Sequence, residues 1–379
     1  MNPRSLQGCR VLDLGIITAG AATSALLADL GAQVVKIESD DYRDPFRIWA
    51  PSATAATPTS SPYFRSTNRN KRGAAINLKQ PDGRAAFLRL VAHYDVVVEN
   101  FRRGVLERLG LSFADLRRAN PKIILASISS QGEDGPHSGH VSFGSTLDAM
   151  GGLAWLSGYA GGPPVLSGQD LNYPDQVVAL FAVGMIATAW HQKSAEGAHL
   201  DISQRELVSF LCGESFLTPN STTRISNADP DFALQSCFLA ADGIWLAVSV
   251  PVAQVSSLRG LLVLELGLDP GFDLGAGLGQ WVKQVPAEQS AIALRDHGIP
   301  AACANDGAAA MAEQGVSWLW AMQQASDGVP IKGFPFQLAA MPLAIDCDAP
   351  EFGADTVAVL REAGYSTREI DRLLASLPD

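Results

Sequence analysis

The sequence predicts an α/β fold in which a parallel sheet carries helices on its faces. Short runs rich in β-branched residues alternate with stretches of helical periodicity, a pattern typical of strands joined by crossover helices. The chain has 379 residues, 47% of them hydrophobic and 18% charged, so it can form one large or two medium globular domains. The expected strands lie at 9–14, 33–38, 73–78, 94–99 and 122–128.

The first strand and the helix after it predict a Rossmann-like opening unit. Leucines recur at helical spacing over 26–30, and Gly31 follows as a helix stop. The G-x-G-x-x-G fingerprint of dinucleotide-binding proteins is missing, because Gly15 and Gly20 stand five residues apart. The unit therefore argues against a nicotinamide-dependent dehydrogenase.

A large Rossmann-like domain is predicted to span residues 1–217 and to be completed by 325–379. Its crossover helices are expected at 82–93 and 105–119. The long apolar run at 175–195 is bracketed by polar residues and has a core too short for a bilayer span, so it predicts a buried helix.

A smaller α/β domain is predicted at 230–320, after a polar linker at 217–231. It opens with apolar strands at 234–250 on either side of an Asp-Gly turn at 242–243, which predicts a hairpin. The tail at 354–376 has apolar residues at helical spacing, so we expect it to pack back on a domain.

Charge and composition exclude several classes of protein. The net charge of −11 argues against a nucleic-acid binder, which needs a surplus of Lys and Arg. No window approaches the ~20 apolar residues of a membrane span, and the first residues contain no secretory signal. The five cysteines are scattered without C-x-x-C spacing, and H-E-x-x-H is absent. We therefore expect a cytoplasmic protein with no membrane segment, disulfide framework or metal.

A basic segment at 65–72 contains Arg65, Arg69, Lys71 and Arg72 without one acidic residue. Such a cluster could hold a phosphate, although a solvated basic loop is the more common role of a charge cluster. The local sequence leaves both interpretations open.

Basic and amide side chains also follow two of the predicted strands. Asn100 and Arg102 come directly after the strand at 94–99, and Arg108 lies in the helix that follows. Asn77 and Lys79 occupy the corresponding position after 73–78. Because α/β sheets bind phosphorylated ligands at the carboxyl ends of their strands, these residues are candidates for such a site.

Seven segments of this chain resemble the family III CoA-transferases, a family that also includes α-methylacyl-CoA racemases. The resemblance spans nearly the whole chain and is weakest from about 220 to 325. The segments are VLDL at 11–14, AGAATSALLADLGAQVVKIE at 19–38, NRNKRGAAINLKQPDGR at 68–84, DVVVENFRRGVLERLG at 95–110, NPKIILASISSQGEDGP at 120–136, AMGGLAWLSG at 149–158 and the tail at 349–366.

The resemblance implies coenzyme A as ligand, an acyl-CoA and a carboxylic acid as substrates, and no metal, nucleic-acid or membrane partner. It also implies two ring-shaped subunits threaded through one another, either a homodimer or a heterodimer with a homologous subunit. Ser39 stands where relatives carry an Arg or similar group near the adenine. The implied CoA contacts, taken together with two basic residues of the segment 65–72, are Thr18, Ala19, Lys71, Arg72, Ile76, Asn77, Leu78, Lys79, Asn100, Phe101, Arg102 and Arg108.

The family's catalytic aspartate follows a G-x-P-P-x-x-x-G stretch, which is present here at 161–168. Counting without gaps, its slot holds Tyr173, while Asp175 lies two residues later and Asp170 three earlier. Asp175 is the predicted nucleophile, because the dipole at a helix start would keep its carboxylate ionised. A plain helix-start role for Asp175 is the alternative.

Two other functions remain open from the sequence. A racemase would need a histidine base, and His140 in a Gly-His pair is the nearest candidate, although Phe143 occupies the ungapped slot. A catalytically silent subunit that pairs with an active relative is the second alternative.

Overall fold

In the computed structural model, the chain forms two compact units. The first consists of Met1–Ala154, Leu166–Thr218 and Leu319–Asp379, and the second of Trp155–Val165 and Pro219–Trp318. The second unit thus takes a short segment out of the range predicted for the large domain. The structure describes residues 4–49, 61–167, 172–217, 224, 226–267, 269, 271–312, 321–334, 336–339, 341 and 343–375.

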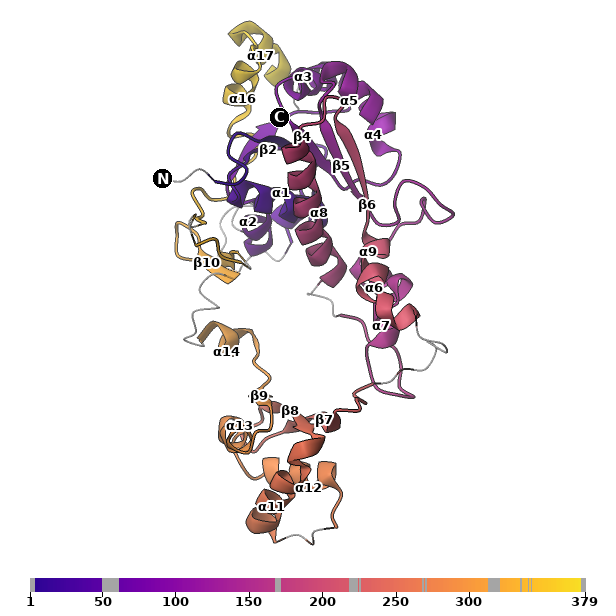
Figure 1. Ribbon diagram of the computed structural model, residues 1–379. Helices are drawn as coiled ribbons and strands as arrows, with labels where there is room; N and C mark the ends of the chain where they lie inside the picture. Colours follow the sequence, from indigo (N-terminus) through magenta and orange to yellow (C-terminus); the bar gives the residue numbers. More distant parts are fainter. Residues whose placement is uncertain are drawn as a thin grey trace. The chain divides into compact units, whose positions relative to one another are not determined.

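A six-stranded parallel sheet forms the centre of the first unit (Figure 1). Its order, β3-β2-β1-β4-β5-β6, is that of a doubly wound Rossmann sheet. The predicted α/β class and five predicted strands are confirmed, and β6 is a sixth strand that the sequence analysis missed. The strands are β1 (Arg10–Asp13), β2 (Gln33–Glu38), β3 (Lys71–Ala75), β4 (Val96–Glu99), β5 (Ile124–Ser129) and β6 (Ala198–Ser203).

Alternate residues of the strands build two cores, one on each face of the sheet, as the two-residue period of a strand requires. One core joins Val11, Val34, Val96 and Ile124 to helices α1 (Ala19–Asp29) and α8 (Tyr173–Gln192). The other joins Leu12, Val35, Val97 and Leu125 to α3 (Pro81–Val91), α5 (Phe113–Ala119), α16 (Thr356–Glu362) and α17 (Thr367–Ala375).

Short elements complete the first unit. Helices α6 and α9 contact each other and α8, and α2 contacts α1. These elements are η1 (Pro45–Arg47), α2 (Pro62–Asn68), α4 (Val105–Arg108), α6 (Gly144–Gly151), α7 (Leu153–Leu156, which runs into the second unit), α9 (Gln204–Leu211), α10 (Gly213–Phe216), β10 (Met322–Gln324) and β11 (Pro330–Lys332).

The predicted helix at 105–119 is two helices, α4 and α5. Gly110 ends the first helix with a φ of +68°, which a glycine adopts at no steric cost, and its N–H bonds the carbonyl of Glu107. Ser112 then caps α5, with the Asp115 carboxylate accepting the Ser112 N–H at 2.9 Å. A stop and a start signal within three residues therefore outweigh the continuous apolar pattern.

Helix α8 is only half buried in the single chain, which corrects the expectation of a buried helix. Val178, Ala182 and Ile186 lie in the core, whereas Leu180 and Phe181 are 47% and 45% exposed. In the described part of the chain, no helix is both long enough and apolar enough to cross a bilayer. The apolar outer face of α8 is available for contact with another protein.

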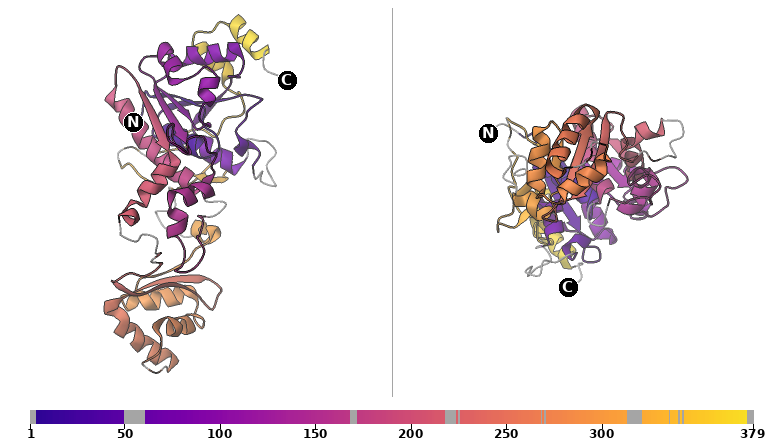
Figure 2. Two further views of the ribbon diagram at one scale, coloured as in Figure 1. Left: turned by 90° about the vertical axis from the view of Figure 1, so that its right-hand side faces the viewer. Right: turned by 90° about the horizontal axis from the view of Figure 1, so that it is seen from below.

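The second unit packs three helices against a three-stranded antiparallel sheet, β7-β8-β9 (Figure 2). The predicted hairpin is confirmed, because β7 and β8 pair on either side of Gly243, whose φ is +81°. The elements are β7 (Phe232–Leu239), β8 (Trp245–Pro251), β9 (Ala301–Cys303), η3 (Val252–Gln254), α11 (Val255–Leu266), α12 (Leu274–Val282), α13 (Ala287–Asp296) and α14 (Gly307–Ala312).

Arg224 explains why the segment 155–165 belongs to the second unit. Its buried guanidinium donates to the carbonyl oxygens of Trp155, Tyr159 and Gly162 at 2.6 to 3.0 Å. It also lies 4.9 Å from the centre of the Trp155 ring. The glycine and proline residues that precede the candidate nucleophile are thus held by one arginine.

Candidate active site

The strand order reverses between β1 and β4, and two glycines meet just beyond this point. A Cβ added to Gly15 would lie 2.5 Å from the carbonyl carbon of Gly20, and one added to Gly20 would lie 2.7 Å from Oδ1 of Asn100. The five-residue spacing therefore brings the turn after β1 directly against the start of α1. Such switch points are where doubly wound sheets bind their ligands.

Asn100 fixes the turn after β1 from the β4 side. Its Oδ1 accepts the N–H of Ile16 at 2.8 Å, and its Nδ2 donates to the Ile16 carbonyl at 3.1 Å. Ile17 adopts a φ of +59°, which is unusual for a β-branched residue, and its N–H donates to Asp44 at 3.1 Å. Backbone strain of this kind persists where the surroundings over-determine it, commonly at functional sites.

Lys36 and Asp44 fix the same turn from the β2 side. The Lys36 ammonium donates to the Gly15 carbonyl at 2.8 Å and to Asp44 at 3.0 Å, with both side chains at most 1% exposed. Burial is the largest single effect and by itself would lower the pKa of Lys36, but the carboxylates of Asp44, Asp13 and Glu38 together outweigh it and the pKa is raised. Nothing in the local sequence distinguishes Asp44 from the nearby Asp40 and Asp41, so the sequence analysis missed it.

If CoA binds at this switch point, as the resemblance implies, replacing Gly20 by Ala is expected to weaken its binding at least about tenfold and to cost about 1–3 kcal/mol of stability. The new methyl group would overlap both Asn100 and the Gly15 backbone, so the turn must shift. Isothermal titration with CoA and thermal unfolding would measure the two effects. Gly260→Ala on α11 of the second unit is the matched control, because the structure places no neighbouring group within 4 Å of its Cβ position. Unchanged CoA affinity in Gly20→Ala would contradict this role.

The basic segment at 65–72 is not a solvated loop, because most of it lies in α2 and β3 and each of its four cations has an acidic partner. Lys71 is buried and donates to Asp13, the Ala21 carbonyl and Asn68 at 2.8 to 3.0 Å. Burial lowers the pKa of Lys71 to about 8 despite the nearby Asp13. The pairs are Arg65 with Asp327, Arg69 with Asp29, Lys71 with Asp13, and the half-exposed Arg72 with Glu362.

The residues after β3 shape the edge of the sheet. Asn77 is buried, with its Nδ2 donating to Asp41 at 3.2 Å and its Oδ1 accepting the Lys79 N–H at 3.0 Å. Lys79 is exposed, and its ammonium lies 3.6 Å from the same Asp41. Leu78 is half-buried and packs on the adjacent core. Of these residues, Lys79 presents its charge to solvent.

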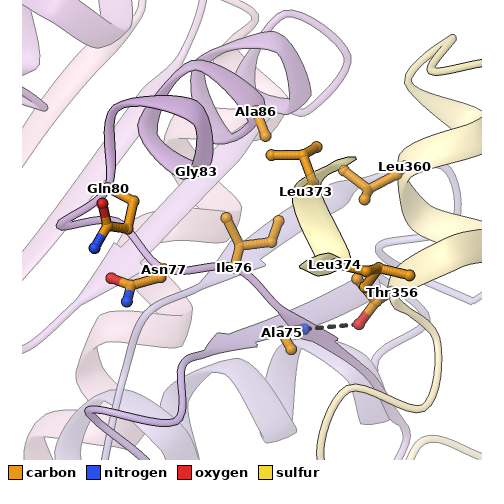
Figure 3. Close-up of a pocket in the computed structure, with 10 residues that line it drawn as sticks. All are labelled: Ala75, Ile76, Asn77, Gln80, Gly83, Ala86, Thr356, Leu360, Leu373 and Leu374. Carbon is orange, nitrogen blue, oxygen red and sulfur yellow. Dashed lines mark hydrogen bonds between the residues drawn. The ribbon is translucent and has the colours of Figure 1, made fainter. Parts of the chain in front are cut away.

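The buried side chain of Ile76 lines a small cavity rather than a ligand pocket (Figure 3). Leu360 and Leu373 of the C-terminal helices face it, and the Ala75 N–H bonds the Thr356 hydroxyl at 2.8 Å. The volume of about 10 Å³ is close to the minimum for one water molecule. The C-terminal helices thus close this part of the sheet edge.

Two arginines and an aromatic pair remain open at the carboxyl ends of β2 and β4. Arg102 and Arg108 are exposed, and neither forms an ion pair within the described segments. Phe101 lies edge-on to Tyr42, with 6.0 Å between the ring centres. Thr18 and Ala19 open α1 at the same edge, where the free N–H groups of a helix start favour an anion. Tyr42 is a candidate site residue that the sequence analysis did not name.

Glu99 precedes Asn100 and is buried, with its carboxylate accepting the Phe101 N–H at 2.7 Å. Burial raises its pKa to about 7, against opposing hydrogen bonds from Ser127 and Phe101. Because this pKa exceeds the ordinary 4.5, protonated Glu99 contributes to the free energy of unfolding. This contribution is fully present below about pH 4.5 and is lost as pH rises through 7.

Glu99→Gln is therefore expected to stabilise the protein at about pH 8 relative to wild type, by about 3 kcal/mol at most, and much less at about pH 5. The amide keeps the acceptor for Phe101 and carries no buried charge. Urea unfolding at the two pH values would measure the difference. A stability gap that does not grow with pH would contradict the assignment.

Asp175 lies in the first turn of α8, beyond the carboxyl edge of the sheet. Since α8 connects the parallel strands β5 and β6, it runs opposite to them and begins at their carboxyl ends. Its 20 residues span about 30 Å, whereas the six residues of β6 span about 20 Å. The start of α8 therefore overhangs the edge that carries Asn100 and Arg102.

The carboxylate of Asp175 is half-buried beside α6. A Cβ added to Gly144 would lie 3.6 Å from Oδ2 of Asp175, which is an ordinary contact distance. The glycine therefore leaves a small space between α6 and the Asp175 carboxylate. Burial raises the pKa of Asp175 to about 6, with a smaller contribution from the charge of Asp148. The sequence analysis considered only the helix dipole, which lowers the pKa of Asp175, whereas burial has the larger effect and raises it. A carboxyl group with a pKa of about 6 is still mostly ionised at neutral pH.

The other candidates for the chemistry are placed differently. Asp170 lies outside the described residues. His140 is exposed, and its ring lies 4.8 Å from that of His137. Within the described residues, no hydrogen bond or ion pair joins His140 to Asp175. In the part of the chain that the structure describes, no three His, Cys, Asp or Glu side chains are grouped to hold a metal ion.

A larger cavity of about 450 Å³ lies at the opposite end of the sheet. Asp95, Lys122 and Ala198 mark the amino ends of strands there, and Trp190 and Lys193 mark the end of α8. Volume alone does not make it the active site, since ligands of such sheets bind beyond the carboxyl ends.

Comparison with known proteins gives the family. The model of CoA-transferase family III matches residues 6–356. The chain belongs to CoA-transferase family III. Enzymes of this family use CoA thioesters as substrates, which agrees with exposed arginines at the switch point.

Relatives of this CoA-transferase carry specific activities in their names. Succinyl-CoA–D-citramalate CoA-transferase of Chloroflexus aurantiacus is 32% identical over 79% of this chain and 78% of its own length. Succinate–glutarate CoA-transferase of Agrobacterium fabrum is 32% identical over 63% of this chain and 61% of its own. The crystal structure of a CaiB/BaiF family protein from Brucella suis superposes with a TM-score of 0.83 at 26% identity, covering 96% of this chain and all of that one.

Proposed function

We propose that this CoA-transferase moves coenzyme A from an acyl-CoA donor to a free carboxylic acid, with Asp175 as nucleophile. The observation that carries the proposal is the half-buried Asp175 carboxylate at the overhanging start of α8. It lies on the side of the sheet where Asn100, Arg102 and Arg108 follow β4. Phosphates at that edge would direct the pantetheine arm outward toward the start of α8.

The residues at the sheet edge have distinct proposed roles in binding CoA. Arg102 and Arg108 would pair with phosphates, assisted by the N–H groups at the start of α1. Phe101 and Tyr42 would pack against the adenine, which needs a flat apolar contact where this chain has Ser39. Thr18, Ala19, Ile76, Asn77 and Leu78 would supply shape and backbone groups, and Lys79 a further charge.

The proposed reaction begins when an Asp175 oxygen attacks the thioester carbonyl, the C–S bond breaks and CoA leaves as a thiolate. The thiolate attacks the aspartyl carbonyl of the resulting anhydride, which releases the donor acid and leaves an aspartyl-CoA thioester. The acceptor carboxylate displaces the thiolate from Asp175, and the thiolate then attacks the acceptor carbonyl. The acceptor leaves as its CoA thioester and Asp175 returns as a carboxylate, with no net oxidation or proton transfer.

Chemical trapping tests this mechanism. Hydroxylamine added during turnover of succinyl-CoA with a panel of dicarboxylic acids would convert an activated aspartate into a hydroxamate. Succinyl-CoA is the first donor to try because several relatives carry succinyl-CoA or succinate in their names. We expect peptide mass spectrometry to find the hydroxamate on Asp175, and free CoA to give none. A hydroxamate on Asp170, or on no carboxylate, would reject Asp175.

We also propose that the enzyme works as an interlocked dimer of two copies of this chain. The support is a set of exposed apolar side chains on α8 and α9, which a single chain leaves in water. They are Leu180, Phe181, Met185, Phe210 and Leu211. One relative, an L-malate CoA-transferase of Chloroflexus aurantiacus, is named as an alpha subunit. Sedimentation of the purified chain is expected to show an active dimer. An inactive monomer would favour the silent-subunit alternative.

A further inference from the structure

Asp148 carries a buried carboxylate that the mechanism above does not use. It lies on α6 and is 0% exposed. Its Oδ2 accepts the backbone N–H of Ser167 at 3.1 Å and also the Ser167 hydroxyl. Its Oδ1 is buried and has no hydrogen-bond donor within the described ranges. Burying a charged oxygen without a donor is costly, so stability does not account for an acid at this position.

The position of Asp148 connects it with Asp175 in two ways. Ser167, which it holds, lies at the start of the stretch that leads to the nucleophile. Gly144 lies one helical turn before Asp148, and residues four apart share a helix face. Because the Cβ position of Gly144 is 3.6 Å from Asp175 Oδ2, this face of α6 adjoins the nucleophile.

We propose that Asp148 is a positioning residue for Asp175, which anchors the preceding segment through Ser167 and keeps a negative charge beside the nucleophile. The inference rests on the proposed function of Asp175. A neighbouring negative charge makes a carboxylate more basic, and a more basic carboxylate is the better nucleophile toward a thioester. The unpaired Oδ1 leaves the charge of Asp148 less neutralised than a fully bonded carboxylate would be.

Two neighbouring groups respond to the charge of Asp148. Burial is the main cause of the raised pKa of Asp175, and the charge of Asp148 adds to it. Burial is also the main cause of the raised pKa of the Cys212 thiol, with smaller contributions from the charges of Asp148 and then Glu214. On the elements packed against α8, and on α8 itself, Asp148 is the charged side chain that acts on Asp175. The other titratable or charged residues of these elements are Asp29, Tyr173, His191, His199, Asp201, Arg205 and Glu206.

Two variants separate the charge of Asp148 from its shape. Asp148→Asn keeps an oxygen for Ser167 and removes the charge. The acid limb of the kcat/KM profile is expected to move to lower pH, by less than about one pH unit because burial is the larger cause, while kcat falls several-fold. Asp148→Glu keeps the charge and displaces Ser167, so its acid limb is expected to stay near the wild-type pH while kcat falls.

A measurement independent of turnover keeps this inference distinct from the proposed function. Carbodiimide labels protonated carboxyl groups, and the pH at which labelling of Asp175 falls by half is read by peptide mass spectrometry. We expect this midpoint to drop in Asp148→Asn and the Cys212 thiol to alkylate faster at a given pH. An unchanged Asp175 midpoint in a folded Asp148→Asn protein would overturn the inference.

The remaining outcomes are also decisive. If the wild-type protein shows no transfer activity but the Asp175 labelling midpoint still drops in Asp148→Asn, the proposed function is rejected. The effect of the Asp148 charge on Asp175 is then still supported. If Asp148→Asn does not fold, Asp148→Glu decides: an Asp175 midpoint at the wild-type pH supports the inference, and a lowered midpoint overturns it.

Discussion

Asp175→Ala is expected to reduce CoA transfer by at least about 10³-fold while CoA binding stays within about twofold of wild type. The side chain supplies the atom that becomes acylated, and no other carboxylate is described at the start of α8. The CoA contacts proposed at the sheet edge belong to other elements, so affinity for free CoA does not depend on this side chain. Steady-state assays and isothermal titration would measure the two quantities separately.

The controls for this variant address the alternatives directly. Alanine is preferable to asparagine because an asparagine can deamidate and restore the acid. Asp170→Ala is the matched comparison, since Asp170 is the other acid near the family slot. Full activity in Asp175→Ala together with lost activity in Asp170→Ala would transfer the nucleophile to Asp170. Activity in both would reject an aspartyl intermediate in this segment.

The pH dependence of wild-type turnover provides a second test of Asp175. Its pKa is raised to about 6, and only the ionised carboxylate attacks a thioester. We therefore expect kcat/KM to be constant above about pH 7 and to fall as pH drops through 6. An acid limb near pH 4 would indicate an ordinary exposed carboxyl as the nucleophile.

The sequence predicted the sheet well because its inner strands are continuous apolar runs flanked by helical periods. It missed β6, whose residues AHLDIS alternate and lie at the edge of the sheet, where only Ile202 and Ser203 are buried. An edge strand has one neighbour and one covered face at most, so it leaves a weak hydrophobic pattern. The break at Gly110 was visible in the sequence, but the apolar spacing masked it.

The sequence predicts candidate site residues that directly follow a strand. It does not predict contacts between side chains that lie far apart in the chain. Asn100 and Arg102 follow a strand directly, so the parallel sheet itself brings them to its edge. Lys71 is part of a basic cluster that the sequence offered as a phosphate site, yet its partner Asp13 lies 58 residues away. A charge cluster in the sequence does not reveal which acids the fold will bring to it.

Lys71→Met is expected to destabilise the protein by about 3–5 kcal/mol, because it removes the cation that hydrogen-bonds the buried Asp13 carboxylate and leaves only the more distant charge of Lys36. Both side chains of the pair are 0% exposed, and the Gly15 N–H would be the main remaining partner of Asp13. The adjacent Arg72→Met removes a pair in which both side chains are at least 35% exposed, so it is expected to cost about 0–1 kcal/mol. Urea unfolding of the two variants would measure this difference.

The double variant Asp13→Asn with Lys71→Met separates the buried pair from any role in ligand binding. Removing both charges avoids the unpaired carboxylate, so we expect it to recover most of the stability that Lys71→Met loses. Should Lys71→Met lower CoA affinity and leave stability intact, the ammonium would be a phosphate ligand after all. Lys71 also bonds the Ala21 carbonyl in α1, the helix whose first residues are proposed to contact CoA. We therefore expect loss of CoA affinity only together with loss of stability.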